Sequence, residues 1–143
     1  MPSGIYRKVT KPSEQGLGKF LGKLEIAIME VLWRSSPLTV RQVRERVSHD
    51  RPLAYTTIMT VMGRLAEKGV LQRAKQGRAF MYRPTGSREE LRADLAAGVS
   101  RALLADFGEV AVAQFVKQLE SIDPSALARL ADLANADEDE TDG

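Results

Sequence analysis

The hydrophobic positions in the first half of the chain recur at the spacing of helices. The first series predicts a helix over about 22–34, and its members are Leu21, Leu24, Ile28, Val31 and Leu32. A second series predicts a short helix over 40–47, and its members are Val40, Val43 and Val47. Thr39 and Gln42 fit a capping box at the start of this second helix, because each side chain can satisfy the backbone N–H of the other residue.

A third helix and a hairpin follow along the sequence. The third helix is predicted over 55–68, and Gly69 can take the left-handed conformation that ends it. The segments 70–75 and 79–83 are predicted to be strands, joined by a turn in which Gly77 tolerates positive φ. Three helices followed by a hairpin is the order of a winged helix-turn-helix domain.

The last third of the chain returns to helical periodicity. It predicts three amphipathic helices, the last opened by Asp123 as N-cap before Pro124. Three such helices form a thin layer with a poor core, and burial against a second copy is the simplest remedy. The predicted interface residues of this homodimer are Leu91, Leu95, Val99, Leu103, Phe115, Leu119, Leu127 and Leu130.

The predicted fold class is therefore mainly α with a small β-hairpin wing. We expect a winged helix-turn-helix domain over 19–85, followed by a C-terminal helical dimerisation region over 86–136. Residues 1–18 are basic and rich in Pro, Gly and Ser, so we expect a flexible arm there. Residues 137–143 are expected to form a disordered acidic tail.

The charge is divided between the two parts of the sequence. Residues 1–86 carry 16 Lys or Arg and 6 Asp or Glu, a net charge of +10. Residues 87–143 carry 5 and 13, a net charge of −8. This division favours a first part that meets a polyanion, and chance segregation of solvated surface charge is the alternative.

The composition excludes several kinds of site. The chain of 143 residues has no cysteine, so disulfides and thiolate metal sites are absent, and it has one histidine, His49. The sequence shows no nucleophile–base pair, phosphate loop or metal constellation, no signal peptide, and no apolar run near the roughly 20 residues that span a bilayer. We expect a cytoplasmic, nucleoid-associated protein without cofactors or membrane insertion that is not an enzyme.

The third helix has one face that solvation does not explain. Its predicted buried stripe consists of Ile58, Val61, Met62 and Leu65. The opposite face is centred on Thr56, Thr60, Gly63 and Glu67, with Met59 and Arg64 beside it. Threonine offers a hydroxyl to phosphates or base edges and a methyl to thymine, and glycine permits close approach. This is the place of the recognition helix in a helix-turn-helix domain.

The candidate DNA contacts follow from that placement. They are Arg41, Arg51, Tyr55, Thr56, Thr57, Met59, Thr60, Gly63, Arg64, Lys75 and Arg78. The cations among them would contact phosphates and make binding salt-sensitive without supplying sequence preference. Arg44 and Arg46 fit solvated side chains better, and Arg64 fits a contact within the domain as well as one to DNA.

Four segments resemble the BlaI/MecI/CopY family, the penicillinase repressors. The matching stretches are LGKLEIAIMEVLW (21–33), LTVRQV (38–43), LAYTTIMTVMGRLAEKGVL (53–71) and GRAFMYRP (77–84). The resemblance implies a homodimer, held by the C-terminal helices, that binds a palindromic operator in double-stranded DNA and blocks transcription. The copper-sensing branch has a C-terminal cysteine cluster, which this chain lacks.

The resemblance also implies a route to induction. In the family a membrane-bound sensor metalloprotease detects a β-lactam, and the repressor is then cut near the start of the second C-terminal helix. Gln114-Phe115 falls where the staphylococcal members have the scissile Asn-Phe pair, so it is the candidate cleavage site, with Gln in place of Asn.

Other functions stay open on sequence alone. A winged-helix protein–protein adaptor would carry an acidic or neutral third-helix face, which the charge of residues 1–86 opposes. An activator without protease-linked induction, or an architectural DNA-binding protein, is poorly separated from a repressor by its residues.

Overall fold

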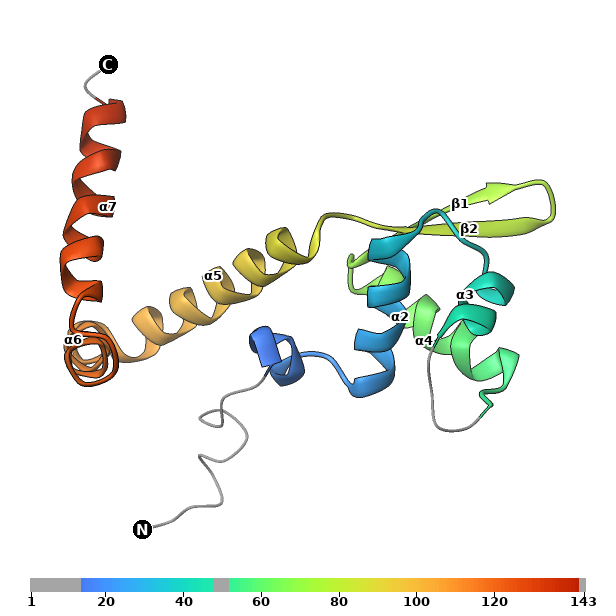
Figure 1. The fold of residues 1–143 in the computed structure, drawn as a ribbon, viewed down its shortest axis with the longest axis horizontal. Coiled ribbons are helices and arrows are strands. Elements are labelled where there is room, and N and C mark those ends of the chain that lie inside the picture. The colour runs from blue at the N-terminus through green and yellow to red at the C-terminus, as the bar shows by residue number, and fades with distance from the viewer. Residues whose placement is uncertain (1–13, 48–51, 142–143) are drawn as a thin grey trace, which may run out of the picture. The chain divides into compact units, whose positions relative to one another are not determined.

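A computed structural model describes residues 14–47 and 52–141, and the chain divides after Leu95 into two compact units. The elements of the first unit are η1 (Glu14–Lys19), α2 (Lys23–Arg34), α3 (Val40–Arg46), α4 (Tyr55–Glu67), β1 (Leu71–Gln76) and β2 (Ala79–Pro84) (Figure 1). The first turns of α5 (Arg88–Phe107) also belong to this unit. The second unit holds the rest of α5 with α6 (Glu109–Ile122) and α7 (Ala126–Thr141).

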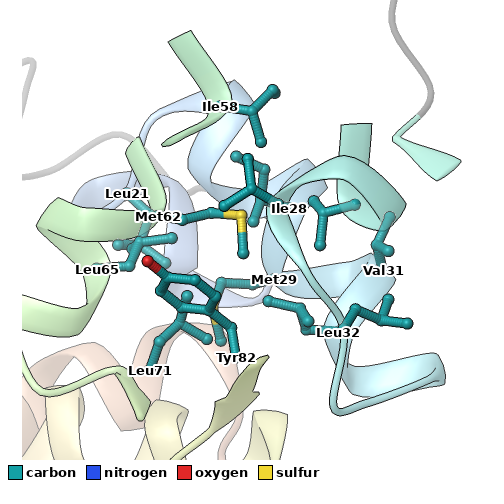
Figure 2. Packing of buried hydrophobic residues seen from close by; sticks show 13 residues of the cluster. Leu21, Ile28, Met29, Val31, Leu32, Ile58, Met62, Leu65, Leu71 and Tyr82 are labelled. Atoms are coloured by element: carbon teal, nitrogen blue, oxygen red, sulfur yellow. The ribbon is translucent and has the colours of Figure 1, made fainter. Parts of the chain in front are cut away.

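The core of the first unit forms between α2 and α4 (Figure 2). Their inward faces meet through side chains that are at most 1% exposed, namely Ile28, Met29, Leu32, Ile58, Met62 and Leu65. Full burial stabilises such side chains by about 1.5–3 kcal/mol each, so this layer holds α4 firmly. The predicted stripe of the third helix is confirmed, with Val61 half-buried at its edge.

The wing is an antiparallel hairpin whose base belongs to the core. Gln76 pairs with Ala79, so Gly77 and Arg78 form a two-residue turn, and Gly77 has the positive φ that was predicted (+64°). Near the base, Leu71 and Tyr82 are buried. The backbone of Tyr82 also exchanges two hydrogen bonds with Leu38 (3.0 and 2.8 Å), which attaches the segment before α3 to β2.

Local signals placed the boundaries of these elements well. At the start of α3 the Thr39 hydroxyl accepts from the Gln42 N–H (3.2 Å), and the Gln42 side chain accepts from the Thr39 N–H (2.9 Å). The predicted capping box is confirmed. Gly69 has φ +82°, as expected for the residue that ends α4.

The predicted end of the N-terminal arm differs from the structure. Residues 14–18 of the expected arm lie in η1, where Leu17 is buried and its carbonyl accepts the N–H of Leu21 (2.9 Å); residues 1–13 lie outside the described residues. The apolar Leu17 explains the difference, because its burial anchors the turn.

At the other end, α7 begins at Ala126 rather than Pro124. Ser125 Oγ donates to Asp123 Oδ1 (2.7 Å), and this local bond makes a separate turn before the helix. The same helix extends to Thr141, into the segment expected to be disordered. The sequence has no Gly or Pro between Ala126 and Asp142 that would end the helix earlier.

The second unit has little core of its own. Among its described residues Ala126 is the single buried apolar side chain, whereas most large apolar side chains are exposed. No helix in the described part of the chain combines the length and apolar character needed to cross a membrane.

Candidate nucleic-acid interface

The outward face of α4 carries the residues predicted to read DNA. Thr56, Thr57 and Thr60 are exposed, and the side chain of Met59 is 44% exposed although it is apolar. These residues lie opposite the buried stripe, so the core fixes the direction in which they point. The face therefore presents hydroxyl and methyl groups on a rigid support.

Gly63 lies in the middle of this helix without a packing reason. A Cβ atom added to Gly63 would meet none of the described residues within 4 Å. Glycine in a helix interior costs about 1 kcal/mol relative to alanine. Contacts among the described residues do not account for this cost, so Gly63 is a candidate position for close approach by another molecule.

The first turn of α4 is open to an anion. Ala54 occupies the N-cap, and no side chain of the described residues caps the helix. The Ala54 carbonyl accepts from Thr57 and Ile58, which leaves the N–H groups of Tyr55 and Thr56 without a helical partner. Helix N-termini with unpaired N–H groups suit phosphate oxygens, and the exposed Tyr55 ring lies beside this one.

Arg44 supports the same turn from the preceding helix. Its Nε donates to the carbonyl of Leu53 at 2.7 Å, just before α4 begins. Arg46 donates to Ser35 Oγ at 3.0 Å. Both side chains are exposed, as expected for solvated arginines. Arg44 also holds the residue that precedes the N-cap of α4. The spacing of residues along the sequence did not reveal this contact.

The wing carries further cations. Lys75 and Arg78, which the sequence predicts to contact phosphates, are exposed. Arg73 was not predicted: its guanidinium carbon lies 4.9 Å from the centroid of the Phe80 ring, within the range of a cation–π contact. The period of two along β1, which places Arg73 on the same face as Lys75, was the available signal.

A hollow of about 390 Å³ lies between α4 and β1, and its lining includes Gly63, Gln72 and Arg73. It joins the open Gly63 position to the basic side of the wing. The helix α4 and the strand β1 therefore border one concave surface within the first unit.

The remaining predicted DNA contacts are Arg41, Arg51 and Arg64. Arg41 on α3 and Arg64 on α4 are both exposed. Arg51 and His49 lie outside the described residues. The described residues contain no group of three or more His, Asp or Glu that could hold a metal ion.

The predicted dimer residues fall into three groups. Leu91 packs against the core of the first unit and therefore already has a partner within the chain. Leu95, Leu119 and Leu127 are half-buried. The exposed group consists of Val99, Leu103, Phe115 and Leu130. Further large apolar side chains that were not predicted for the interface are also exposed: Leu104, Phe107, Val110, Val112, Ile122 and Leu133.

Comparison with known proteins identifies the family. A profile of the penicillinase repressors matches residues 21–136. The chain belongs to the penicillinase repressor family. The resemblance carried by the four sequence segments is thereby confirmed, and the family is one of repressors.

Relatives of the penicillinase repressor family can be aligned over much of the chain. The transcriptional regulator BlaI of Mycobacterium tuberculosis is 42% identical over 116 residues, which cover 79% of this chain and 84% of that protein. The penicillinase repressor of Bacillus licheniformis is 35% identical over 60 residues, 42% of this chain and 47% of its own. The solution structure of the DNA-binding domain of the repressor BlaI has 30% identity and a TM-score of 0.44, covering 50% of this chain and 87% of that one.

Proposed function

We propose that this member of the penicillinase repressor family represses transcription by binding a palindromic operator as a homodimer, with α4 in the major groove and the wing on the phosphate backbone. The observation that carries the DNA-binding part is the outward face of α4. It exposes threonines and Gly63, whose Cβ position is open, on a helix that a fully buried apolar core holds in place. Exposed cations on α3 and on the wing accompany this face. A protein that acts on an operator works in the cytoplasm, at the nucleoid.

Variants at Thr60 and Arg78 separate base reading from phosphate contact. Thr60→Ala should weaken binding to the operator about tenfold, the size of one good base contact, and leave binding to random DNA unchanged. Arg78→Ala should weaken binding to both DNAs and reduce the slope of log K against log salt by about 1. Gel-shift titrations at two salt concentrations measure both effects.

Matched variants make this test specific. Thr60→Ser keeps the hydroxyl and removes the methyl, so it shows whether a thymine methyl is read. Arg101→Ala removes an exposed arginine from α5 and should leave the salt slope unchanged. Equal losses on operator and random DNA for Thr60→Ala would refute base reading, and no DNA binding at low salt would favour a protein–protein adaptor.

The homodimer part rests on the apolar surface of the second unit. A hollow of about 330 Å³ between α5, α6 and α7 is lined almost entirely by apolar side chains, including Leu104, Val112 and Phe115. The Phe115 and Phe107 rings beside it are 58% and 59% exposed. Monomeric proteins seldom leave so much contiguous apolar surface in water, and side chains of a second copy would cover it. Two copies related by a two-fold axis fit two operator half-sites.

Phe115→Asp tests the homodimer. The variant should sediment as a monomer at concentrations where the parent is a dimer, because a carboxylate would have to be buried in the interface. Its affinity for the full operator should fall to that for a half-site, whereas half-site binding stays unchanged. Gln118→Asp adds the same charge at an exposed polar position of α6 and should remain a dimer. A parent protein that is monomeric at micromolar concentration would refute the dimer.

Induction by cleavage at Gln114-Phe115 is the last part of the proposal. The bond lies inside α6, and a peptide bond in a helix must unwind locally before a protease can hold it in extended form. Both residues are exposed in the single chain, so a membrane-bound sensor metalloprotease would reach the bond where the second copy does not cover it. Intact-mass measurement of the repressor from β-lactam-treated cells should show a fragment ending at Gln114. An intact chain in cells whose target gene is induced would refute cleavage.

A further inference from the structure

A second concave site lies in the first unit, apart from the DNA-reading face. It is a cleft of about 400 Å³ formed by four segments: the C-terminal half of α2, the turn after α4, the link after β2 and the first turns of α5. This volume is within the range of small-molecule sites, about 300–1,000 Å³. None of the residues predicted to contact DNA lines it.

Hydrogen bonds hold the walls of this cleft together. Thr85 Oγ1 donates to the carbonyls of Gly69 (2.9 Å) and Val70 (3.1 Å), which ties the link to the turn after α4. Trp33 Nε1 donates to the Gly86 carbonyl (3.1 Å), and the Arg88 guanidinium carbon lies 5.1 Å from the centroid of the Trp33 ring. The cleft is thus formed in advance, and a ligand would not have to order its walls on binding.

The floor of the cleft is apolar and its rim is acidic. Met29, Trp33 and Leu91 supply apolar surface. The rim carries one cation, Lys68, whose Nζ lies 3.3 Å from Glu25 Oε2 and is therefore already paired. The carboxylates of Glu90 and Asp94 also stand at the rim, one turn apart on α5, and neither makes an ion pair with a described residue.

We propose that this cleft binds a small amphipathic cation. Its amine would lie against the carboxylates of Glu90 and Asp94, and its aromatic or aliphatic body would pack on Met29, Trp33 and Leu91. Of the two carboxylates Asp94 is the main anchor, because Glu90 already accepts from Ser87 Oγ (3.4 Å). The two cations nearest the cleft are already engaged, Lys68 by Glu25 and Arg88 by Glu30 and the Trp33 ring, so the cleft selects positive charge. The site goes beyond DNA binding and does not depend on it.

Trp33 reports directly on this cleft, because it is the one tryptophan in the chain. The full-length protein is titrated with three ligands of similar shape: 2-phenylethylamine, 2-phenylethanol and 3-phenylpropionate. The tryptophan fluorescence should change saturably with the amine, which should bind about fivefold tighter than the alcohol, as expected for a solvent-accessible ion pair. The carboxylate should bind most weakly.

Asp94→Asn supplies the decisive comparison. It should weaken binding of the amine about fivefold and leave binding of the alcohol unchanged, since only the charged partner loses its ion pair. Asp106→Asn removes an exposed carboxylate of α5 that does not line the cleft and should change neither affinity. Calorimetry detects any binding that leaves the fluorescence unaltered. Equal affinities for the amine and the alcohol, no effect of Asp94→Asn, or no binding heat at millimolar amine would each overturn the proposal.

Discussion

The two units of the chain differ in how far their apolar side chains are exposed. In the first unit seven large side chains are less than 2% exposed, and they come from α2, α3 and α4. In the described part of the second unit only Ala126 is buried, while Ile122 and Leu133 are 78% and 68% exposed. The first unit is therefore stabilised by its own core, whereas the second unit leaves most of its large apolar side chains exposed among the described residues.

The charges follow the same division. The basic residues 1–86 contain the surface that we assign to DNA, and the acidic residues 87–143 contain the apolar surface that we assign to a second copy. DNA repels an acidic surface, and this is why we assign the apolar faces of α5 to α7 to protein contact. Matched substitutions in the two units test this difference.

Substitution in the core of the first unit should have the largest effect. Leu65→Ala should lower the free energy of unfolding by about 3 kcal/mol, because a fully buried leucine leaves a cavity. Leu133→Ala should change it by less than about 0.5 kcal/mol at low protein concentration, because the side chain is already in water. Urea unfolding followed by Trp33 fluorescence and circular dichroism measures both. A similar loss for Leu133→Ala would show that the second unit has a core within one chain.

Most of the first unit could be predicted from its sequence because each boundary has a local signal. Thr39 and Gln42 start α3, Gly69 ends α4 and Gly77 turns the hairpin, and each acts through its own backbone or that of a close neighbour. The outward face of α4 follows from helical periodicity alone, since the buried stripe defines the opposite side. The apolar side chains of α6 and α7 carry the same kind of periodicity, whereas those of α5 do not gather on one face.

The contacts that could not be predicted join residues far apart in the sequence. The pairing of Leu38 with Tyr82 and the hydrogen bond from Trp33 to Gly86 each span more than 40 residues, and no local pattern specifies them. Arg44 shows the consequence for the candidate site. Its position on α3 indicated a solvated cation, whereas the fold brings it to the Leu53 carbonyl.

Two helical glycines allow a matched test of smaller size. Gly63 in α4 and Gly98 in α5 both have open space where a Cβ atom would be. Gly63→Ala and Gly98→Ala should each stabilise their helix by about 0.5–1 kcal/mol, because alanine is the better helix former. Only Gly63→Ala should weaken operator binding, since its methyl group would stand on the reading face. Thermal unfolding and gel shifts measure the two properties, and unchanged operator affinity for Gly63→Ala would refute a close approach at this position.

The smallest effect is expected at the turn between α6 and α7. The hydrogen bond from Ser125 and the positive charge of Arg129 hold the pKa of Asp123 below its ordinary value of 3.8. A depressed pKa in the folded state means that the ionised carboxylate stabilises the turn above pH 3.8, and that this contribution is lost as the pH falls through the lower, folded-state pKa. Asp123→Asn should therefore reduce helix stability slightly at neutral pH and have no effect in strong acid, as measured by circular dichroism during heating. Asp132→Asn, an exposed position of α7, serves as the control. Asp123 is open to solvent, so the expected loss of helix stability is small. A loss of stability that was large, or equal at all pH values, would mean that the side chain acts through its shape rather than its charge.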